Sequence, residues 1–529
     1  MKLYVAPRAS AVHKSVAQVS KPAVSPISKS AGTGTPSSRQ NLWTPAGLET
    51  CATSKSEKFL KGPVPTTTAP RGFVLVAVLV VILLASMVAI SLLFRLKAEE
   101  TATAAGIGGE QAWAAAMTGV YEAIQAAQQS PPGELDWQDA PQIFRDRLVF
   151  DDGSDRWFFS VYAEGGSEHP GIRFGLSDEA GKLNLNRASE AMLGKIPKLT
   201  PYLVQGLLDF IDTDNAARPE GAEQEYYDGL AHPYSVLNSR LSTLEELLLV
   251  RGFTPGLLYG EDANLNFQLD ANEDDGGEQF PPDNGDGKLD PGLRPYLTVW
   301  SYDLNEDNEG VPRTDLNNPA DVIPEGLLPA AFTNYIAAVR RNKIRINQPA
   351  DLLDAKGKFK DEKGAEVELE SGVGTKELAL VLDQFTTRSE YHLPGLINVN
   401  TASAQVLQAL PDVEPALAET IVAARTHLRA EQRGTPAWLY QEQLVDADLF
   451  KKLSPYLTAR SYQYHFHVLG YGMPSGRYRV LEAVVDLAGL KPQITYLRDL
   501  TRLGLPFKIE QSERPEATVQ LHRKEVPHG

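Results

Sequence analysis

The chain has 529 residues, which is enough for a membrane anchor and two or three domains, and a formal net charge of −17 at pH 7. This acidic balance argues against nucleic-acid binding, whose affinity comes mainly from Lys and Arg that neutralise phosphates. The single cysteine, Cys51, precedes a long apolar run, so the chain after that run can form no disulfide and holds no cysteine nucleophile.

Residues 1–72 form a basic leader that is rich in Ser, Thr, Pro and Ala. They carry ten Lys and Arg against two Glu, whereas the rest of the chain carries 41 Lys and Arg against 66 Asp and Glu. The leader has no hydrophobic periodicity, which predicts disorder. Because basic residues mark the cytoplasmic side of a membrane span, the charge pattern predicts a cytoplasmic N-terminus and an acidic bulk on the other side.

Residues 73–97 are predicted to form a transmembrane helix. From Phe73 to Phe94 the sequence runs for 22 residues without a charge, a Pro or a Gly. About 20 apolar residues at a rise of 1.5 Å each are needed to cross a hydrocarbon core about 30 Å thick. A single run of this kind cannot close into a barrel, so we expect one helical crossing.

The helix is predicted to continue beyond the membrane to about Gln129. Apolar residues recur there at helical spacing, namely Trp113, Met117, Val120 and Ile124. The sequence Ser130-Pro131-Pro132-Gly133 then ends the helix. Strands are expected at 156–164 and 171–175, so that 98–189 would hold a long helix and the first strands of a sheet.

Two residues at the start of the apolar run resemble a processing site. Gly72 followed by Phe73, with Arg71 before them, is similar to the cleavage site of type IV prepilins and type II secretion pseudopilins. The resemblance implies that a prepilin peptidase cuts between Gly72 and Phe73 and that the new terminal Phe73 is methylated. A leader of this length departs from the family pattern, and either the leader is extended or translation begins near Val64.

The fifth residue after the implied cut is Ala77, where most members of that family carry Glu. Since a carboxylate without a partner is costly in lipid, a subunit that lacks it suits the filament tip, where the usual neighbour is missing. Within type II secretion, this departure resembles the K-type minor pseudopilin.

A repeat begins on either side of the central region. Residues 183–203 and 397–417 match at a constant offset of 214, for example Asn184 with Asn398. Weaker echoes occur at Thr314–Pro319 and Ile344–Leu352. Asn and Ser in this pattern cap the first turn of a helix. The second copy resembles the helix-hairpin-helix of competence-type DNA receptors, but its turn, at 412–415, carries two carboxylates where such receptors have Gly.

Residues 181–262, 395 onward and the ending at 458–489 resemble the K-type minor pseudopilin of the type II secretion system, the general secretion pathway protein K family. The resemblance implies a pilin-like α/β (α+β) fold, in which a long N-terminal helix lies on a small antiparallel sheet. A mostly helical domain with degenerate helix-hairpin-helix repeats would be inserted at 190–455. The strands of 456–510 would complete the sheet, and 511–529 would be a disordered tail.

The same resemblance implies a structural function. The protein would sit at the tip of the type II secretion pseudopilus and help to start its assembly for the export of folded proteins across the outer membrane. It would be a single-pass protein of the bacterial inner membrane with its bulk in the periplasm. Its partners would be other minor pseudopilins, the major pseudopilin and the prepilin peptidase.

Acidic loops in the insertion predict a calcium site. An EF-hand loop has oxygen ligands at positions that are occupied here by Asp262, Asn264, Asn266, Asp270 and Glu273, although Phe267 replaces the Gly at its sixth position. The family resemblance also implies calcium, with Asp212, Asp214 and Glu223 as the matching acidic positions. A solvated acidic surface without metal is the alternative, and which of these residues ligate metal stays open.

The sequence carries no H-E-x-x-H, G-x-S-x-G or Walker A motif, and we predict no enzymatic activity. His465 and His467 alternate in an expected strand and are predicted to face solvent rather than bind metal. Two alternatives of other classes remain at this point. One is a membrane-anchored helix-hairpin-helix receptor for DNA, and the other is a periplasmic hydrolase with an unrecognised site.

Overall fold

The structure is a computed structural model, and it describes residues 71–166, 171–324 and 326–509. The predicted tail at 511–529 and residues 1–70 of the predicted leader lie outside the described residues. The chain divides into two compact units, Met1–Leu84 and Ala85–Gly529. In the described residues, the first unit contributes the beginning of helix α1, and the second holds the rest of α1 and all other elements.

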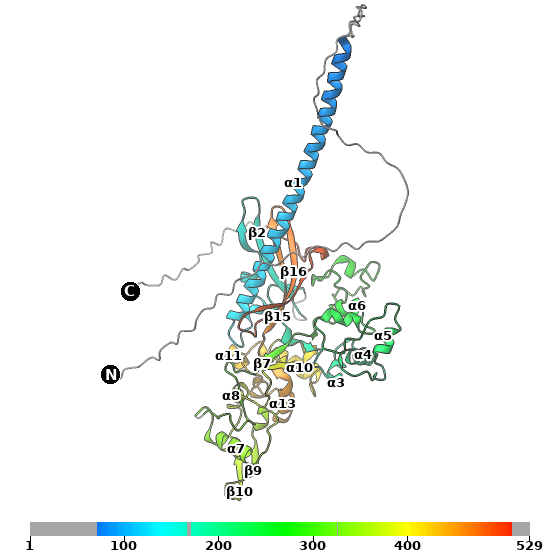
Figure 1. The fold of residues 1–529 in the computed structure, drawn as a ribbon. Helices are drawn as coiled ribbons and strands as arrows, with labels where there is room; N and C mark the ends of the chain where they lie inside the picture. The colour runs from blue at the N-terminus through cyan, green and yellow to red at the C-terminus, as the bar shows by residue number, and fades with distance from the viewer. Residues whose placement is uncertain (1–70, 167–170, 325, 510–529) are drawn as a thin grey trace, which may run out of the picture. The chain divides into compact units, whose positions relative to one another are not determined.

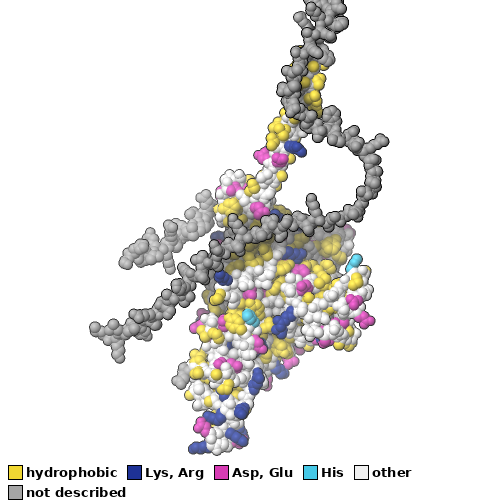
Figure 2. Space-filling view, in the orientation of Figure 1, with side chains coloured by type: hydrophobic (Ala, Val, Ile, Leu, Met, Phe, Trp, Pro, Cys, Tyr) yellow, Lys and Arg dark blue, Asp and Glu magenta, His cyan; other side chains and the backbone are white. Residues whose placement is uncertain are grey.

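Helix α1 runs without interruption from Arg71 to Gln129 and ends where the Ser-Pro-Pro-Gly sequence predicts. Among the described residues it is the one helix long and apolar enough to cross a membrane, which agrees with the predicted span. Side chains 74–107 are exposed, and Figure 2 shows hydrophobic groups on the surface of this helix. From Ala112 onward, one face of α1 is buried by the sheet.

A seven-stranded sheet packs against α1 (Figure 1). Its five main strands are antiparallel and lie in the order β1 (Arg147–Asp151), β2 (Arg156–Glu164), β15 (Gln463–Met473), β16 (Tyr478–Asp486) and β17 (Gln493–Asp499). Short strands β3 (Ile172–Arg173) and β4 (Ser177–Asp178) pair with β2 and β15. The strand predicted at 156–164 is β2, and strands from the C-terminal part complete the sheet as expected.

Both faces of this sheet are covered. On the first face, Phe159, Val161, Phe466 and Val468 pack with the buried side of α1. On the second, the sheet residues Tyr162, Leu469, Tyr471 and Val480 pack with Leu265 and Phe267 from an acidic loop of the insertion and with Leu500. The central strand β15 is therefore buried on both sides, as its sequence of mostly buried positions shows.

The segment between β4 and β15 contains short helices joined by long loops. Its helices are α3 (Glu190–Leu193), α4 (Pro201–Ile211), α5 (Gln224–Asp228), α6 (Pro255–Tyr259), α7 (Ala330–Arg341), α8 (Leu378–Gln384), α9 (Ala404–Gln408), α10 (Pro415–Arg425), α11 (Ala430–Arg433), α12 (Trp438–Gln441) and α13 (Ala447–Leu453). Helix α2 (Pro141–Phe144) precedes the sheet.

The same segment also contains strands, all of them short. They are β5 (Leu183–Asn184), β6 (Leu297–Thr298), β7 (Tyr302–Leu304), β8 (Thr314–Asp315), β9 (Lys356–Lys360), β10 (Glu366–Glu370), β11 (Phe385–Thr386), β12 (His392–Pro394), β13 (Ile397–Asn398) and β14 (Leu457–Thr458). The prediction of a mostly helical insertion was therefore wrong. Asn and Asp side chains in this segment accept N–H groups of the backbone two residues on, which favours turns over continued helix.

The repeat occurs three times, each time as a short parallel strand pair followed by a turn. The pairs are β5 with β6, β8 with β11, and β13 with β14. In each pair the first strand ends on an Asn or Asp whose side-chain oxygen accepts a hydrogen bond from the backbone N–H two residues later. These residues are Asn184, Asp315 and Asn398, and the N···O distances are 3.0, 2.8 and 3.0 Å. Thr314–Pro319, a weak echo in the sequence, is thus a full third copy.

The echo at Ile344–Leu352 has another role. The backbone N–H and C=O of Ile346 both bond the side chain of Asn317, each at 2.9 Å. Leu241 bonds Asn186 in the same way, at 2.8 and 3.0 Å. The echo therefore lies in a segment whose backbone forms two hydrogen bonds with the side chain of the last Asn of the turn. It is not a further copy of the turn.

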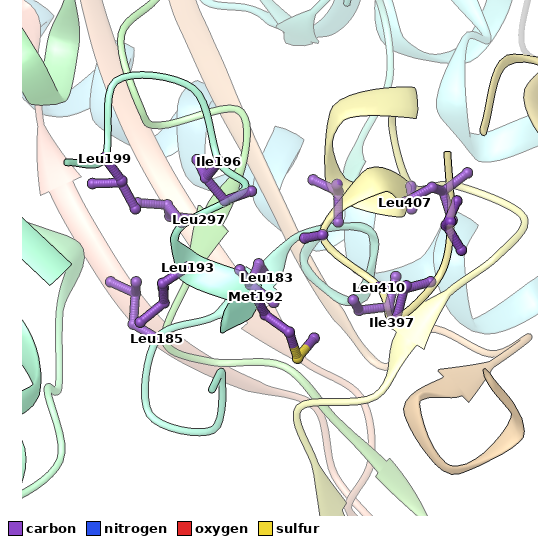
Figure 3. Close-up of a cluster of buried hydrophobic side chains, with 14 of the residues drawn as sticks. Leu183, Leu185, Met192, Leu193, Ile196, Leu199, Leu297, Ile397, Leu407 and Leu410 are labelled. Carbon is purple, nitrogen blue, oxygen red and sulfur yellow. The ribbon is translucent and has the colours of Figure 1, made fainter. Parts of the chain in front are cut away.

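The first and last copies share one hydrophobic core. Figure 3 shows Leu183, Met192 and Leu193 of the first copy beside Ile397 and Leu410 of the last. As predicted, a serine caps the helix after each turn: Ser189 accepts from the N–H of Met192 and Ser403 from that of Val406, both at 3.3 Å. The caps direct the apolar residues of α3 and α9 into this common core.

Close packing of α1 on β15 gives a testable prediction. A Cβ added to Gly470 would collide with the backbone of Ala112 and Ala116 in α1. We expect Gly470→Val to lower the free energy of unfolding by about 3 kcal/mol, the upper end of overpacking costs. Urea denaturation would measure the change. Gly489→Ala is the control, since its Cβ would meet only Lys491 at 3.5 Å, and equal stability of the two variants would contradict the packing described.

Candidate metal and processing sites

The implied processing residues lie at the start of α1. Gly72 and Phe73 fall in its first turn, and Ala77 follows one turn later with an exposed side chain. The apolar side chains from Val74 to Leu96 are also exposed, for instance Leu75 at 71%. A helix that is apolar on all sides and exposed fits a lipid environment.

Three carboxylates converge where α4 ends and α5 begins. Asp209 lies in the last turns of α4, Asp212 follows its end, and Glu223 precedes α5. One oxygen of each lies within 4.8 Å of the others, close enough to hold one ion. Asp209 and Glu223 are buried, and Asp212 is half-buried. Gly221 lies so close to the Asp209 carboxylate that a Cβ there would collide with it.

One cation already lies in this group. Arg218 bonds the Asp209 carboxylate through its guanidinium and through its backbone N–H at 3.1 Å, and it bonds Asp212 at 2.7 Å. Neither oxygen of Glu223, nor Oδ1 of Asp212, has a hydrogen-bond partner among the residues that the structure describes. Three carboxylates against one guanidinium leave two negative charges uncompensated, which a divalent cation would neutralise. These residues therefore fit a calcium ion.

The pKa of Glu223 reflects this surplus of negative charge. Burial raises it first, and the neighbouring carboxylates Asp209 and Asp212 raise it further, against a smaller opposing effect of Arg218. Sequence analysis missed Asp209, although its spacing of three from Asp212 at a helix end places both carboxylates on one face. Asp214 does not join the group, because it is exposed and accepts the N–H of Ala216 at 2.9 Å.

In the EF-hand-like loop, the side-chain oxygens accept hydrogen bonds from the loop's own backbone. Asp262 accepts from the N–H groups of Asn266 and Phe267 at 2.9 and 3.1 Å. Glu273 accepts from Ala263 and Asp270 at 3.0 and 3.1 Å. Asn264 and Asn266 each donate a side-chain hydrogen bond to Asp270, at 2.7 and 2.8 Å, and their own side-chain oxygens accept the N–H groups of Asn266 and Gln268. Within the described residues, these side chains form no group of three carboxylates close enough to hold a metal.

Phe267, at the position of the EF-hand glycine, has a φ of 62°. This left-handed backbone costs a non-glycine residue about 1–2 kcal/mol. Burial of the ring offsets the cost, since Phe267 packs on Tyr162 and on His467 of the sheet, with ring centroids 6.3 and 4.8 Å away. The loop keeps the sharp EF-hand turn and uses the residue there to cover the sheet.

The prediction that His465 and His467 face solvent was wrong. His467 is fully buried, and the His465 side chain is 12% exposed. Alternation along the strand correctly placed both on one face of the sheet, but it could not show that Phe267 and its loop cover that face. The two rings lie beside Glu482 of β16, which is also buried.

The turn of the last copy carries a carboxylate where a DNA-binding turn would approach phosphate. Asp412, between α9 and α10, has a φ of 56° and pairs with Lys452 at 3.1 Å, with both side chains exposed. The row of lysines on β9 is likewise matched by a row of Glu on β10, with Lys358 opposite Glu368. Neither surface offers the unpaired positive charge that phosphate binding requires.

Comparison with known families assigns two parts of the chain. Residues 181–259, which contain the Asp209, Asp212 and Glu223 group, match the family model described as type II secretion system (T2SS), protein K. The chain carries a protein K domain of type II secretion. This confirms the resemblance to K-type minor pseudopilins. Residues 395–430, which hold β13, α9 and α10, match the helix-hairpin-helix motif, as the second copy predicted.

The chain was also compared with curated proteins and with solved structures. No curated protein matches the chain. A solved chain from the GspK-GspI-GspJ complex of the enterotoxigenic Escherichia coli type 2 secretion system matches with 12% identity and a TM-score of 0.35. The match covers 77% of this chain and 99% of that one.

The environment of Glu223 predicts how removing its charge changes the stability of the metal-free protein. Because its pKa is raised in the folded state, ionised Glu223 opposes folding as the pH rises through that pKa. In excess chelator at neutral pH, we expect Glu223→Gln to raise the melting temperature by a few degrees. Thermal unfolding followed by circular dichroism would measure it, with the exposed Glu220→Gln as control. A lower melting temperature for Glu223→Gln in chelator would contradict the proposed repulsion.

Proposed function

We propose that this protein is the K-type minor pseudopilin at the tip of the type II secretion pseudopilus and that it helps to start pseudopilus assembly. The observation that carries the proposal is the protein K domain at 181–259. That domain is inserted between β4 and β15, strands of the sheet that packs on α1. An anchor helix, a small sheet and this domain make a subunit that acts by binding its neighbours.

The membrane arrangement follows from α1 and from the charge of the chain. We propose that α1 anchors the protein in the bacterial inner membrane, with the N-terminus in the cytoplasm and the acidic bulk in the periplasm. The basic leader and the acidic remainder support this orientation. The expected partners are other minor pseudopilins, the major pseudopilin and the prepilin peptidase. Exposed side chains 74–107 of α1 offer a surface to the neighbouring subunits.

Ala77 supports the place at the tip. The side chain is exposed on α1 and carries no charge. A Glu at this position would need a positive partner in lipid, because a charge in the hydrocarbon core is costly. A subunit that needs no positive partner at this position can be the first in the filament, where no other subunit precedes it.

The other classes of function lack support in the structure. A DNA receptor would need unpaired basic groups at the helix-hairpin-helix turn, where Asp412 and Glu414 stand instead. A hydrolase would need a nucleophile activated by a base in an accessible cleft. The protein K match points to a component of secretion, and the charges at the turn favour protein partners over DNA.

Processing gives a direct test of the function. We expect N-terminal sequencing of the membrane-purified protein to begin at Phe73. Gly72→Glu should leave the full-length precursor in the membrane and abolish release of the secreted proteins into the medium, because a side chain blocks the peptidase. Gly62→Glu makes the same change ten residues earlier and should be processed normally. Normal secretion by the Gly72→Glu strain would overturn the proposal.

We propose in addition that calcium binds the Asp209, Asp212 and Glu223 group. The unpartnered oxygens of Glu223 and Asp212 support this, as does the surplus of two negative charges. Carboxylate oxygens suit calcium, which takes six to eight oxygen ligands. The Asp262–Glu273 loop stays a second possible site, although its oxygens already hold backbone amides.

Calcium should therefore reverse the effect of Glu223→Gln. An ion that binds only the folded state stabilises it by about 2.7 kcal/mol at a hundred times its Kd. In calcium we expect the wild type to melt above the variant, whereas in chelator it melts below. Magnesium should act poorly, because its small octahedral shell dehydrates reluctantly. If Asp262→Asn and not Glu223→Gln removes the calcium response, the EF-hand-like loop is the site.

A further inference from the structure

Two strands of the sheet bring two imidazoles and a carboxylate together. His467 of β15 lies directly opposite Glu482 of β16, and His465 is two residues along on the same face. His465 Nε2 lies 3.0 Å from Glu482 Oε1, and His467 Nε2 lies 4.0 Å from the same oxygen. One ligand atom from each of the three residues falls within 4.8 Å of the others. The group is separate from the Asp209 cluster.

The second observation is that His467 is left without polar partners. The ring is fully buried, yet neither nitrogen has a hydrogen bond in the described part of the chain. Oε2 of Glu482, which is 3% exposed, also lacks one. Leaving a buried donor or acceptor without a hydrogen bond destabilises the folded state. A ligand that these atoms share would remove that cost.

The chemistry of the donors selects the ion. Two neutral imidazoles and one carboxylate suit zinc and its neighbours in the first transition series, and they do not suit calcium, which prefers oxygen. Tyr162 stacks on His467 and Phe267 meets it edge to face, with ring centroids 5.4 and 4.8 Å away, and the two rings shield it from water. A metal bound in a site enclosed in this way would stabilise the fold.

Two arginines compete with a metal for the carboxylate. Arg294 bonds Oε1 of Glu482, and Arg498 lies 3.8 Å from Oε2. Since Arg498 is beyond hydrogen-bond distance, Oε2 of Glu482 keeps lone pairs that an ion can take. The competing charge should make the affinity lower than that of a zinc site built from ligands alone.

We propose that His465, His467 and Glu482 bind one zinc-class ion between β15 and β16, beneath the loop that carries Phe267. Such an ion would tie the two central strands of the sheet together under the loop that covers them.

The test is metal binding to the full chain, purified without a polyhistidine tag and stripped with chelator. Titration with cobalt(II) alone should give the visible absorption of a nitrogen- and oxygen-ligated ion at one equivalent, and zinc should displace it while calcium should not. His465→Gln and His467→Phe should each lower zinc affinity by at least about 100-fold, more than loss of an outer-shell partner costs. His232→Gln, at an exposed position, should bind as the wild type does.

The two substitutions are expected to affect folding differently. His467→Phe keeps a ring in the buried space, and His465→Gln changes a side chain that reaches the surface, so melting curves without metal identify which variant retains the fold. If His467→Phe fails to fold, His465→Gln decides. Absence of zinc binding by the wild type would overturn the proposal, and so would unchanged affinity in a folded variant.

Discussion

The burial of β15 on both faces is the constraint on which the rest of the structure depends. One face needs α1, whose backbone approaches Gly470 so closely that no side chain fits between them. The other face needs the insertion, which supplies Phe267 and Leu265. Because the sheet would expose a large apolar area without either cover, the part of α1 after Ala112 and the inserted segment each complete a hydrophobic core on one face of the same sheet.

Polar contacts join the inserted segment to the same strand. Asp178, which pairs with β15 through β4, accepts hydrogen bonds from Asn398 at 2.9 Å and from Ser461 at 2.6 Å. Burial raises the pKa of Asp178 to about 6, although these hydrogen bonds oppose the rise. Asn398 also holds the turn of the last repeat. One buried carboxylate thus links the sheet to the helix-hairpin-helix part of the inserted segment.

Prediction from sequence succeeded where the pattern was long and periodic. The extent of α1 follows from the apolar run, the helical spacing after it and the Ser-Pro-Pro-Gly sequence that ends it, and β2 lies where a strand was predicted. It failed where side chains from distant segments complete a site. The strands that pair with the first and last repeated turns lie in segments that share the sequence PYLT-x-x-SY, at 295–302 and 455–462, so the sequence does contain a signal for these partners. The burial of His467 depends on Phe267, 200 residues earlier in the chain, and no local pattern contains that contact.

We propose that this chain occupies the tip of the pseudopilus. Its uncharged Ala77 and its protein K domain agree with a subunit that begins the filament and does not repeat along it. Immunogold labelling of pseudopili sheared from cells that overproduce the major pseudopilin tests this most directly, with antibody raised against this chain. If the chain stands at the tip, we expect gold at one end of each filament. Gold distributed along the filaments would contradict it.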